Sequence, residues 1–136
     1  MADGLVEMFV ESVRLHMRSN RHVVILKEPD RERYLPIWIG SAEADAIALR
    51  LQGVTPERPL THDLFATTLD ELGVRIRRVV ITRLAEETFH ARLVLERGGT
   101  LIEMDSRPSD ALALAVRMDA PIFAAEEVLE IGRAHV

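Results

Sequence analysis

The stretch that most constrains the fold is DSRPSDALALAVR, which spans residues 105–117. Its second half contains ALALAV, and a helix that is apolar on all sides has to be buried. Pro108 stands where the first turn of this helix would begin, and proline is favoured there because its missing N–H is not needed. The polar first half is therefore predicted to be held rigidly at the start of a helix anchored in the core.

The segments that open the chain are predicted to be strands. Residues 5–17 alternate between apolar and polar, but the alternation slips in phase near Glu11–Ser12, which predicts a strand with a β-bulge. Residues 22–27, HVVILK, form a continuous apolar run that is typical of a central strand. Residues 34–39 follow as a third strand, in which Pro36 indicates a sheet edge or a bulge.

Two amphipathic helices are expected between residues 41 and 73. The first has Ser41 as its N-cap and ends at Gly53. The second has Thr61 as its N-cap, and Gly73 takes the C′ position. The predicted inner faces are Ala44, Ile47, Ala48 and Leu51 in the first helix and Phe65, Leu69 and Leu72 in the second, with Leu60 and Phe65 as a hydrophobic staple.

Three strands follow, over residues 74–84, 88–96 and 100–105, and the Gly98-Gly99 pair predicts a tight hairpin between the last two. After the apolar helix come a short extended piece, APIF, and a last helical turn or two, EEVLEI. Because hairpins dominate and strict strand–helix alternation is absent, this order predicts an α+β fold rather than a doubly wound one.

The whole chain is expected to form one compact domain. The domain covers residues 1–136, with its core from about residue 5 to residue 131. In it, a mixed or antiparallel sheet of about six strands packs with three to four helices.

Composition excludes several classes of protein. The chain has no cysteine, so disulfides, thiolate nucleophiles and thiolate metal sites are ruled out. Its net charge of −5 argues against a domain that coats duplex DNA by charge alone. No apolar run approaches the roughly 20 residues of a membrane span, and the acidic first segment lacks the basic region of a secretory signal. The expectation is a cytoplasmic protein without membrane contact.

The polar half of residues 105–117 is the first candidate site. Asp105 and Asp110 are suited to hold a divalent cation or to act as base and acid. Ser106 or Ser109 would cap the helix, whose free N–H groups attract anions, and Arg107 would add a charged fork for a phosphate. The structural alternative is that the two aspartates cap the helix and that Arg107 pairs with one of them.

The segment RPLTHD, residues 58–63, repeats this order of an arginine, a proline, a hydroxyl and an acid at a helix start. His62 adds a group that titrates near neutral pH. Glu43 would join such a site only where the fold brings it near Asp63 or Asp105. The alternative for RPLTHD is a capped helix with an exposed histidine, but two such clusters in one small domain strengthen the case for a functional site.

A basic strand and two aromatic residues are the remaining candidates. The arginines between residues 75 and 83, with His90 and Arg92 on the next strand, would form a patch able to follow a nucleic-acid backbone. Nearby glutamates favour a balanced, solvated face instead. Trp38 and Tyr34, on the outer face of the predicted edge strand, are either core residues or anchors of an oligomer interface.

Three segments together resemble the bifunctional nuclease domain family: LPIWIGSAEADAIALRLQG, RPLTHDL and DSRPSDALALAVRMDAPIF occur here in that family's order and spacing. The resemblance covers about Val6 to Glu127. It implies a compact α+β domain, often oligomeric, with an activity named for cutting both DNA and RNA. The family's motif residues match this sequence at Glu43, Arg58, Thr61, His62, Asp63, Asp105, Ser106, Arg107, Ser109 and Asp110.

The leading hypothesis is a nuclease that hydrolyses DNA and RNA phosphodiester bonds with little sequence preference. Mg²⁺ or Mn²⁺, held by Asp63, Asp105 and Asp110 with Glu43, would activate water. The candidate catalytic residues are His62, Asp63, Asp105 and Asp110, and the candidate substrate-binding residues are Arg58, Thr61, Ser106, Arg107 and Ser109. This hypothesis requires the two polar helix starts to converge in the fold. The alternative is a non-enzymatic homo-oligomeric binding or regulatory module, whose polar helix starts are structural caps or a small-anion pocket.

Overall fold

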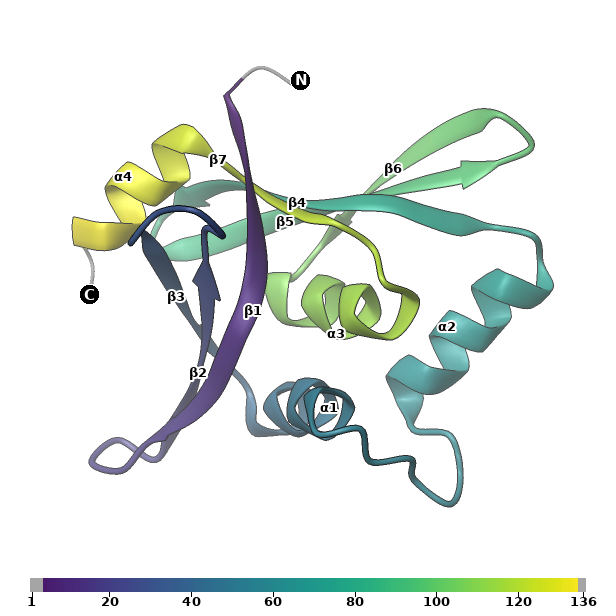
Figure 1. Cartoon of the computed structure of the whole chain (residues 1–136), viewed down its shortest axis with the longest axis horizontal. Coiled ribbons are helices and arrows are strands. Elements are labelled where there is room, and N and C mark those ends of the chain that lie inside the picture. Colours follow the sequence, from purple (N-terminus) through teal and green to yellow (C-terminus); the bar gives the residue numbers. More distant parts are fainter. Residues whose placement is uncertain (1–3, 135–136) are drawn as a thin grey trace.

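The sheet combines three strands from the start of the chain, three from its middle and one from its end. The computed structural model describes residues 4–134, and the side chains of residues 4–130. Within that part, the strands are β1 (Leu5–His16), β2 (Arg21–Lys27), β3 (Tyr34–Ile39), β4 (Arg75–Ala85), β5 (Thr88–Arg97), β6 (Thr100–Ser106) and β7 (Ile122–Ala125). They form a seven-stranded sheet in the order β3-β2-β1-β7-β4-β5-β6 (Figure 1).

The strand β7 joins the two halves of the sheet. It pairs antiparallel with β1 and parallel with β4, so the sheet is mixed. The α+β fold and the mixed sheet predicted from the sequence are confirmed. The described residues contain seven strands rather than about six, because the short extended piece at residues 122–125 is inserted at the centre of the sheet.

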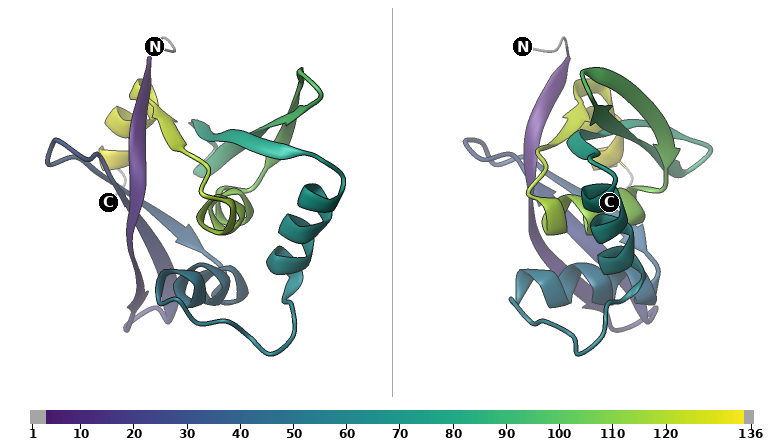
Figure 2. Two further views of the ribbon diagram at one scale, coloured as in Figure 1. Left: turned by 45° about the vertical axis from the view of Figure 1, so that its right-hand side comes forward. Right: turned by 90° about the vertical axis from the view of Figure 1, so that its right-hand side faces the viewer.

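The helix α3 (Pro108–Met118) is the centre of the helical layer. It packs against α1 (Ser41–Leu51), α2 (Thr61–Glu71), β4 and β5 (Figures 1 and 2). Residues 111–115 are at most 2% exposed. The buried helix predicted from the sequence is confirmed, and the polar residues before it are fixed at the edge of the core.

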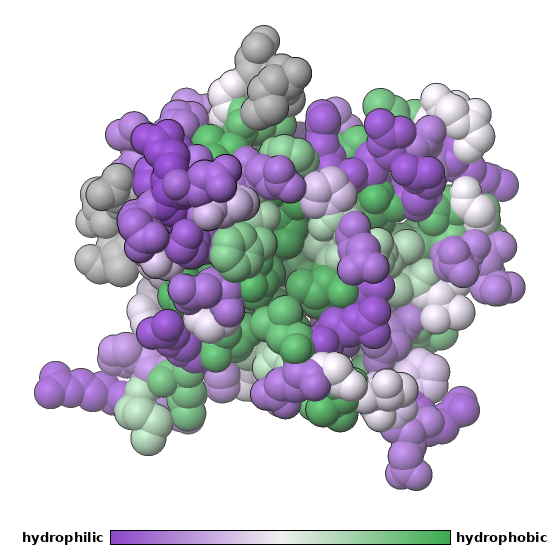
Figure 3. All heavy atoms as spheres, viewed as in Figure 1, coloured by the Kyte–Doolittle hydropathy of each residue, from purple (hydrophilic) through white to green (hydrophobic). Residues whose placement is uncertain are grey.

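The sheet curls around α4 (Glu126–Ala134). This helix contacts both β3 and β4, although three strands separate β3 from β4 in the sheet order. In the space-filling view (Figure 3), apolar side chains gather at the centre of the face around β1 and α3, and hydrophilic side chains surround them. None of the helices in the described part is long and apolar enough to cross a membrane.

Several local predictions are confirmed because they depend on neighbouring residues alone. The register of β1 against β2 shifts between Val10 and Ser12, which is the predicted bulge. Pro36 lies on β3, an edge strand, where its missing N–H interrupts no central pairing. Gly98 and Gly99 both have positive φ, as a two-residue hairpin of this hand requires.

The predicted N-caps of the helices were wrong. The helices α1, α2 and α3 begin one residue after Gly40, Leu60 and Arg107, and no side chain of these N-cap residues makes a capping hydrogen bond. Ser41 and Thr61 are therefore inside their helices, and neither Ser106 nor Ser109 is the N-cap of α3. Gly73 does follow the end of α2 with positive φ, as predicted.

The predicted inner faces of α1 and α2 were partly wrong. On α2 only Leu69 is buried, whereas Leu60 and Phe65 are each 41% exposed and Leu72 is 59% exposed. This helix lies at the edge of the domain (Figure 2) and packs mainly on α3. The contact with α3 buries Leu69 and leaves most of the helix surface exposed. On α1, Ala44 and Ile47 are buried, but Leu51 is 45% exposed.

Candidate functional site

The starts of α2 and α3 lie together, although His62 and Asp110, which they contain, are 48 residues apart in the chain. His62 Nε2 and Asp110 Oδ1 are 2.9 Å apart and share a hydrogen bond. The other carboxylate oxygen, Asp110 Oδ2, accepts a 2.8 Å hydrogen bond from Arg107 Nε. Arg107 Nη2 in turn donates to Glu43 Oε2 at 3.3 Å, so the start of α1 joins the same chain of contacts.

These side chains border a hollow of about 470 Å³, which we call the His62 hollow. Its polar residues are Thr61, His62, Asp105, Ser106, Arg107 and Asp110, and its apolar residues are Phe65, Leu93, Met104 and Leu114. The Arg107 side chain is 64% exposed, whereas those of His62 and Asp110 are 14% and 33% exposed. The hollow therefore presents a solvated cation above a partly buried histidine–carboxylate pair.

Asp63 points away from the His62 hollow. Its Oδ1 accepts a 2.7 Å hydrogen bond from Arg117 Nε, and its Oδ2 accepts the Leu60 N–H at 2.9 Å. The second contact ties Asp63 to the backbone of Leu60, the N-cap residue of α2, a position that the sequence assigned to Thr61. Asp63 lines a different hollow, together with Arg50 and Arg117. Its partner Arg117, only 6% exposed, was not singled out from the sequence, because an arginine in the last turn of a helix is common.

The other candidates are spread around the His62 hollow. Asp105 is exposed and faces Arg92 across the β5–β6 pairing. The Ser106 hydroxyl donates to the backbone carbonyl of Arg107, while Ser109 is 6% exposed and lines a hollow on the other side of Arg107. Arg58 is exposed in the loop before α2 and does not line the His62 hollow.

The carboxylates do not form the metal site expected from the sequence. No three His, Asp or Glu side chains are grouped so as to hold a metal ion anywhere in the described part of the chain. Asp110 and Glu43 both contact Arg107, and Asp63 contacts Arg117. As arranged, Glu43, Asp63, Asp105 and Asp110 do not fit a shared divalent cation.

Comparison with known proteins identifies the family of this chain. The model of the bifunctional nuclease domain matches residues 24–136. This chain belongs to the bifunctional nuclease domain family. It is also 46% identical over 123 residues to an uncharacterized protein of Mycobacterium tuberculosis, a match that covers 90% of this chain and 73% of that protein.

Plant bifunctional nucleases are more distant relatives of this bifunctional nuclease domain. Bifunctional nuclease 1 of Oryza sativa subsp. indica is 27% identical over 114 residues, which cover 81% of this chain and 34% of the plant protein. Bifunctional nuclease 1 of Arabidopsis thaliana is 29% identical over 103 residues, which cover 74% and 32%. The chain thus matches about a third of each plant protein.

The charge state of the acids at and beside the His62 hollow follows from their contacts. Burial raises the pKa of Asp110, but the hydrogen bonds from Arg107 and His62 together outweigh it, so the pKa lies below its ordinary value of 3.8. The pKa of Asp63 is lowered in the same way, by the Leu60 N–H and Arg117 acting against burial. Both carboxylates are ionised near neutral pH, which keeps a negative charge beside the His62 ring.

These lowered pKa values predict how the stability of the domain depends on pH. A carboxylate whose pKa is lower in the folded chain stabilises that state above its unfolded pKa, and this contribution is lost as pH falls through the folded pKa. We therefore expect the free energy of unfolding to fall as pH decreases below about 4. Urea unfolding at a series of pH values measures it. Replacing both Asp63 and Asp110 by asparagine should flatten this dependence, and an equally steep fall in that variant would contradict the assignment.

The basic strand of this bifunctional nuclease domain is partly neutralised. Arg77 Nη1 lies 2.8 Å from Glu96 Oε1, and Arg75 Nε lies 3.8 Å from the same oxygen. The hydrogen bond from Arg77 lowers the pKa of Glu96. This arrangement favours the balanced, solvated face over a continuous nucleic-acid track along β4.

Proposed function

We propose that this chain hydrolyses phosphodiester bonds of DNA and RNA, with little sequence preference, in the His62 hollow. One observation carries the proposal: two polar helix starts, distant in sequence, converge so that His62 and Arg107 share the carboxylate of Asp110. Membership in the bifunctional nuclease domain family and the names of the plant relatives support it.

His62 is suited to act as the base that activates water. With its proton on Nε2, the ring donates to Asp110 Oδ1 and leaves Nδ1 free to accept a proton. A water molecule would lose a proton to Nδ1 as its oxygen bonds to phosphorus, and the bond from phosphorus to the leaving oxygen would break. The leaving oxygen then takes a proton from the imidazolium or from water. Asp110 positions the ring through this hydrogen bond.

Arg107 is suited to bind the phosphate. Its Nε and Nη2 atoms are held by Asp110 and Glu43, so the guanidinium plane is fixed while the side chain remains 64% exposed. Its remaining N–H groups can donate to a phosphate oxygen and stabilise the charge that develops there. Arg58 would contact the nucleic-acid strand from the loop before α2. Thr61 and Ser106 would add hydroxyl contacts from the edge of the His62 hollow.

Replacing Arg107 tests this proposal. We expect Arg107→Ala to lower kcat/KM for a fluorescent oligonucleotide by about 10²-fold, because it removes a donor to the developing charge. Arg107→Lys should recover little of that loss, since an ammonium group cannot make the planar, two-pronged contact. The matched control is Arg97→Ala, which removes another exposed arginine beside the β5–β6 hairpin. Equal activity in Arg107→Ala and the parent would contradict the proposal.

A dependence on Mg²⁺ or Mn²⁺ remains part of the proposal. The same assay with EDTA, and then with each cation restored, measures it. Loss of cleavage with EDTA and recovery with Mn²⁺ would support a cation that binds together with the substrate. Unchanged cleavage in EDTA would restrict the chemistry to the side chains of the His62 hollow.

A homo-oligomer and a cytoplasmic location also stay predictions. Exposed apolar residues on the edge strand β6 and on α2 favour an oligomer, because they are grouped and a contiguous exposed apolar patch is typical of an interaction surface. They are Leu101, Ile102 and Met104 on β6 and Leu64 and Phe65 on α2.

A further inference from the structure

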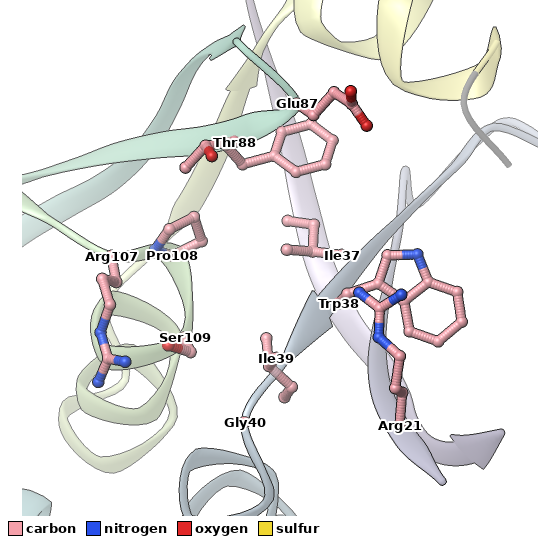
Figure 4. A pocket seen from close by; sticks show the side chains of 11 residues that line it. Arg21, Ile37, Trp38, Ile39, Gly40, Glu87, Thr88, Arg107, Pro108 and Ser109 are labelled. Carbon is pink, nitrogen blue, oxygen red and sulfur yellow. The ribbon is translucent and has the colours of Figure 1, made fainter. Parts of the chain in front are cut away.

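A second hollow lies on the other side of Arg107, and we propose that it binds a nucleotide of a single-stranded nucleic acid next to the phosphate that is cleaved. This Trp38 hollow has a volume of about 350 Å³ and lies between the end of β3, the β4–β5 turn and the start of α3. Figure 4 shows Trp38 and Arg21 on one side of it and Arg107 on the other. The inference rests on the proposed function, because it takes the substrate strand as the ligand.

Trp38 offers a surface on which a base can stack. It is the only tryptophan of the chain, lies on the edge strand β3 and is 43% exposed. The Arg21 guanidinium lies over its ring at 4.4 Å, and the ring of His16 meets it edge-on at 5.7 Å. A tryptophan covered by a cation rather than by apolar packing can exchange that cover for a base, and base–aromatic stacking tolerates any sequence.

The charges that line the hollow suit a phosphate backbone. Arg21 forms no ion pair with a carboxylate in the described part of the chain, so its charge is not neutralised locally. Arg107 borders the hollow from the opposite side, where Asp110 and Glu43 hold its guanidinium, and Glu87 is the one acid among the lining residues. When a base replaces Arg21 on the Trp38 ring, the guanidinium is free to contact the adjoining phosphate.

The size of the Trp38 hollow and its position next to the His62 hollow favour a single-stranded nucleic acid over a duplex. A space of about 350 Å³ holds one nucleotide-sized group but not a duplex. Bases of a duplex are paired and stacked on one another, so none can reach Trp38 without being extruded. Because Arg107 lines both hollows, a strand that places a phosphate on Arg107 would have one nucleotide in the His62 hollow and its neighbour at Trp38.

The fluorescence of Trp38 tests this inference directly, since no other tryptophan contributes. The probe is a short single-stranded phosphorothioate oligonucleotide, which resists cleavage. We expect it to quench the emission of the parent protein in a saturable way. The same oligonucleotide annealed to its complement as a blunt duplex should bind more weakly and quench little. Equal quenching by both forms, or none by the single strand, would overturn the inference.

Variants measure the contribution of each side chain to binding of the same oligonucleotide, labelled with a dye and followed by anisotropy. Trp38→Ala should weaken binding roughly tenfold, and Trp38→Phe should keep most of the affinity because a phenyl ring still stacks. Arg21→Ala should reduce the slope of log affinity against log salt by about 0.7, the value for one phosphate contact on a single strand. The control, Tyr34→Ala, removes an aromatic residue of β3 that does not line the hollow and should bind like the parent.

Cleavage assays separate failure of this inference from failure of the proposed function. If Trp38→Ala binds and cleaves single strands like the parent, the Trp38 hollow is not a binding site, although the nuclease proposal stands. If the parent is quenched by the single strand but cleaves neither form, the hollow binds nucleic acid and the nuclease proposal fails. The expected result is that Trp38→Ala lowers cleavage of single strands more than cleavage of duplexes.

Discussion

Replacing His62 by glutamine is expected to lower the rate of phosphodiester hydrolysis by about 10²- to 10⁴-fold. Glutamine keeps a polar group near Asp110 Oδ1, 2.9 Å from His62 Nε2 in the parent, but has no second nitrogen to accept a proton from water. The change should appear in kcat rather than in binding of an uncleavable oligonucleotide, because the phosphate contact belongs to Arg107. The measurement is a single-turnover time course with purified protein.

The matched control for this variant is His90→Gln. His90 lies on β5, outside the His62 hollow, and its replacement should leave the rate close to that of the parent. Asp110→Asn should lower the rate as His62→Gln does, since it weakens the hydrogen bonds that position the His62 ring and the Arg107 guanidinium. A His62→Gln protein that folds normally and cleaves at the parental rate would remove His62 from the mechanism.

Of the single substitutions proposed for this chain, Asp63→Ala is expected to lower stability most. It should lower the free energy of unfolding by about 2–4 kcal/mol. The change removes the acceptor of the Leu60 N–H and leaves the buried Arg117 guanidinium without its carboxylate. For a domain of this size the loss corresponds to a decrease in Tm of about 10 °C. Urea unfolding and thermal melts measure it.

The same variant separates two roles for Asp63. If the residue acts as the structure indicates, by tying α2 to α3, stability falls and the folded fraction still cleaves. If it is instead a ligand of Mg²⁺ or Mn²⁺, cleavage and its response to the cation are lost while stability changes little. Asp70→Ala, which removes an exposed acid from the same helix, is the control and should alter neither.

Features that depend on neighbouring residues could be predicted from the sequence. The bulge in β1, the glycine hairpin and the buried helix each follow from a short run of residues. The position of β7 could not be predicted, because four residues with no marked alternation become a central strand only when β1 and β4 pair with them. The sequence assigned the N-cap of α2 to Thr61, because hydroxyl residues favour the N-cap position. In the structure Leu60 is the N-cap residue, and the Asp63 side chain accepts its backbone N–H.

In the candidate site, too, local features could be predicted from the sequence and contacts between distant residues could not. The two polar helix starts could be recognised from their composition and from the family resemblance. Which side chains of each start face each other could not, because residues 62 and 63 are adjacent in α2 yet point to different hollows. The Trp38 hollow was not predicted at all, since it exists only because the curled sheet brings the end of β3 near the β4–β5 turn and α3.

The most direct test of the central claim is one comparison of hydrolysis rates. Parent and Asp110→Asn proteins, purified in parallel to the same homogeneity, are assayed on single-stranded DNA and RNA across the fractions of a final gel-filtration column. If the His62–Asp110–Arg107 arrangement is catalytic, cleavage follows the protein peak in the parent and falls by at least about 10²-fold in the variant. Equal cleavage by both proteins would contradict the claim and assign the activity to a contaminant.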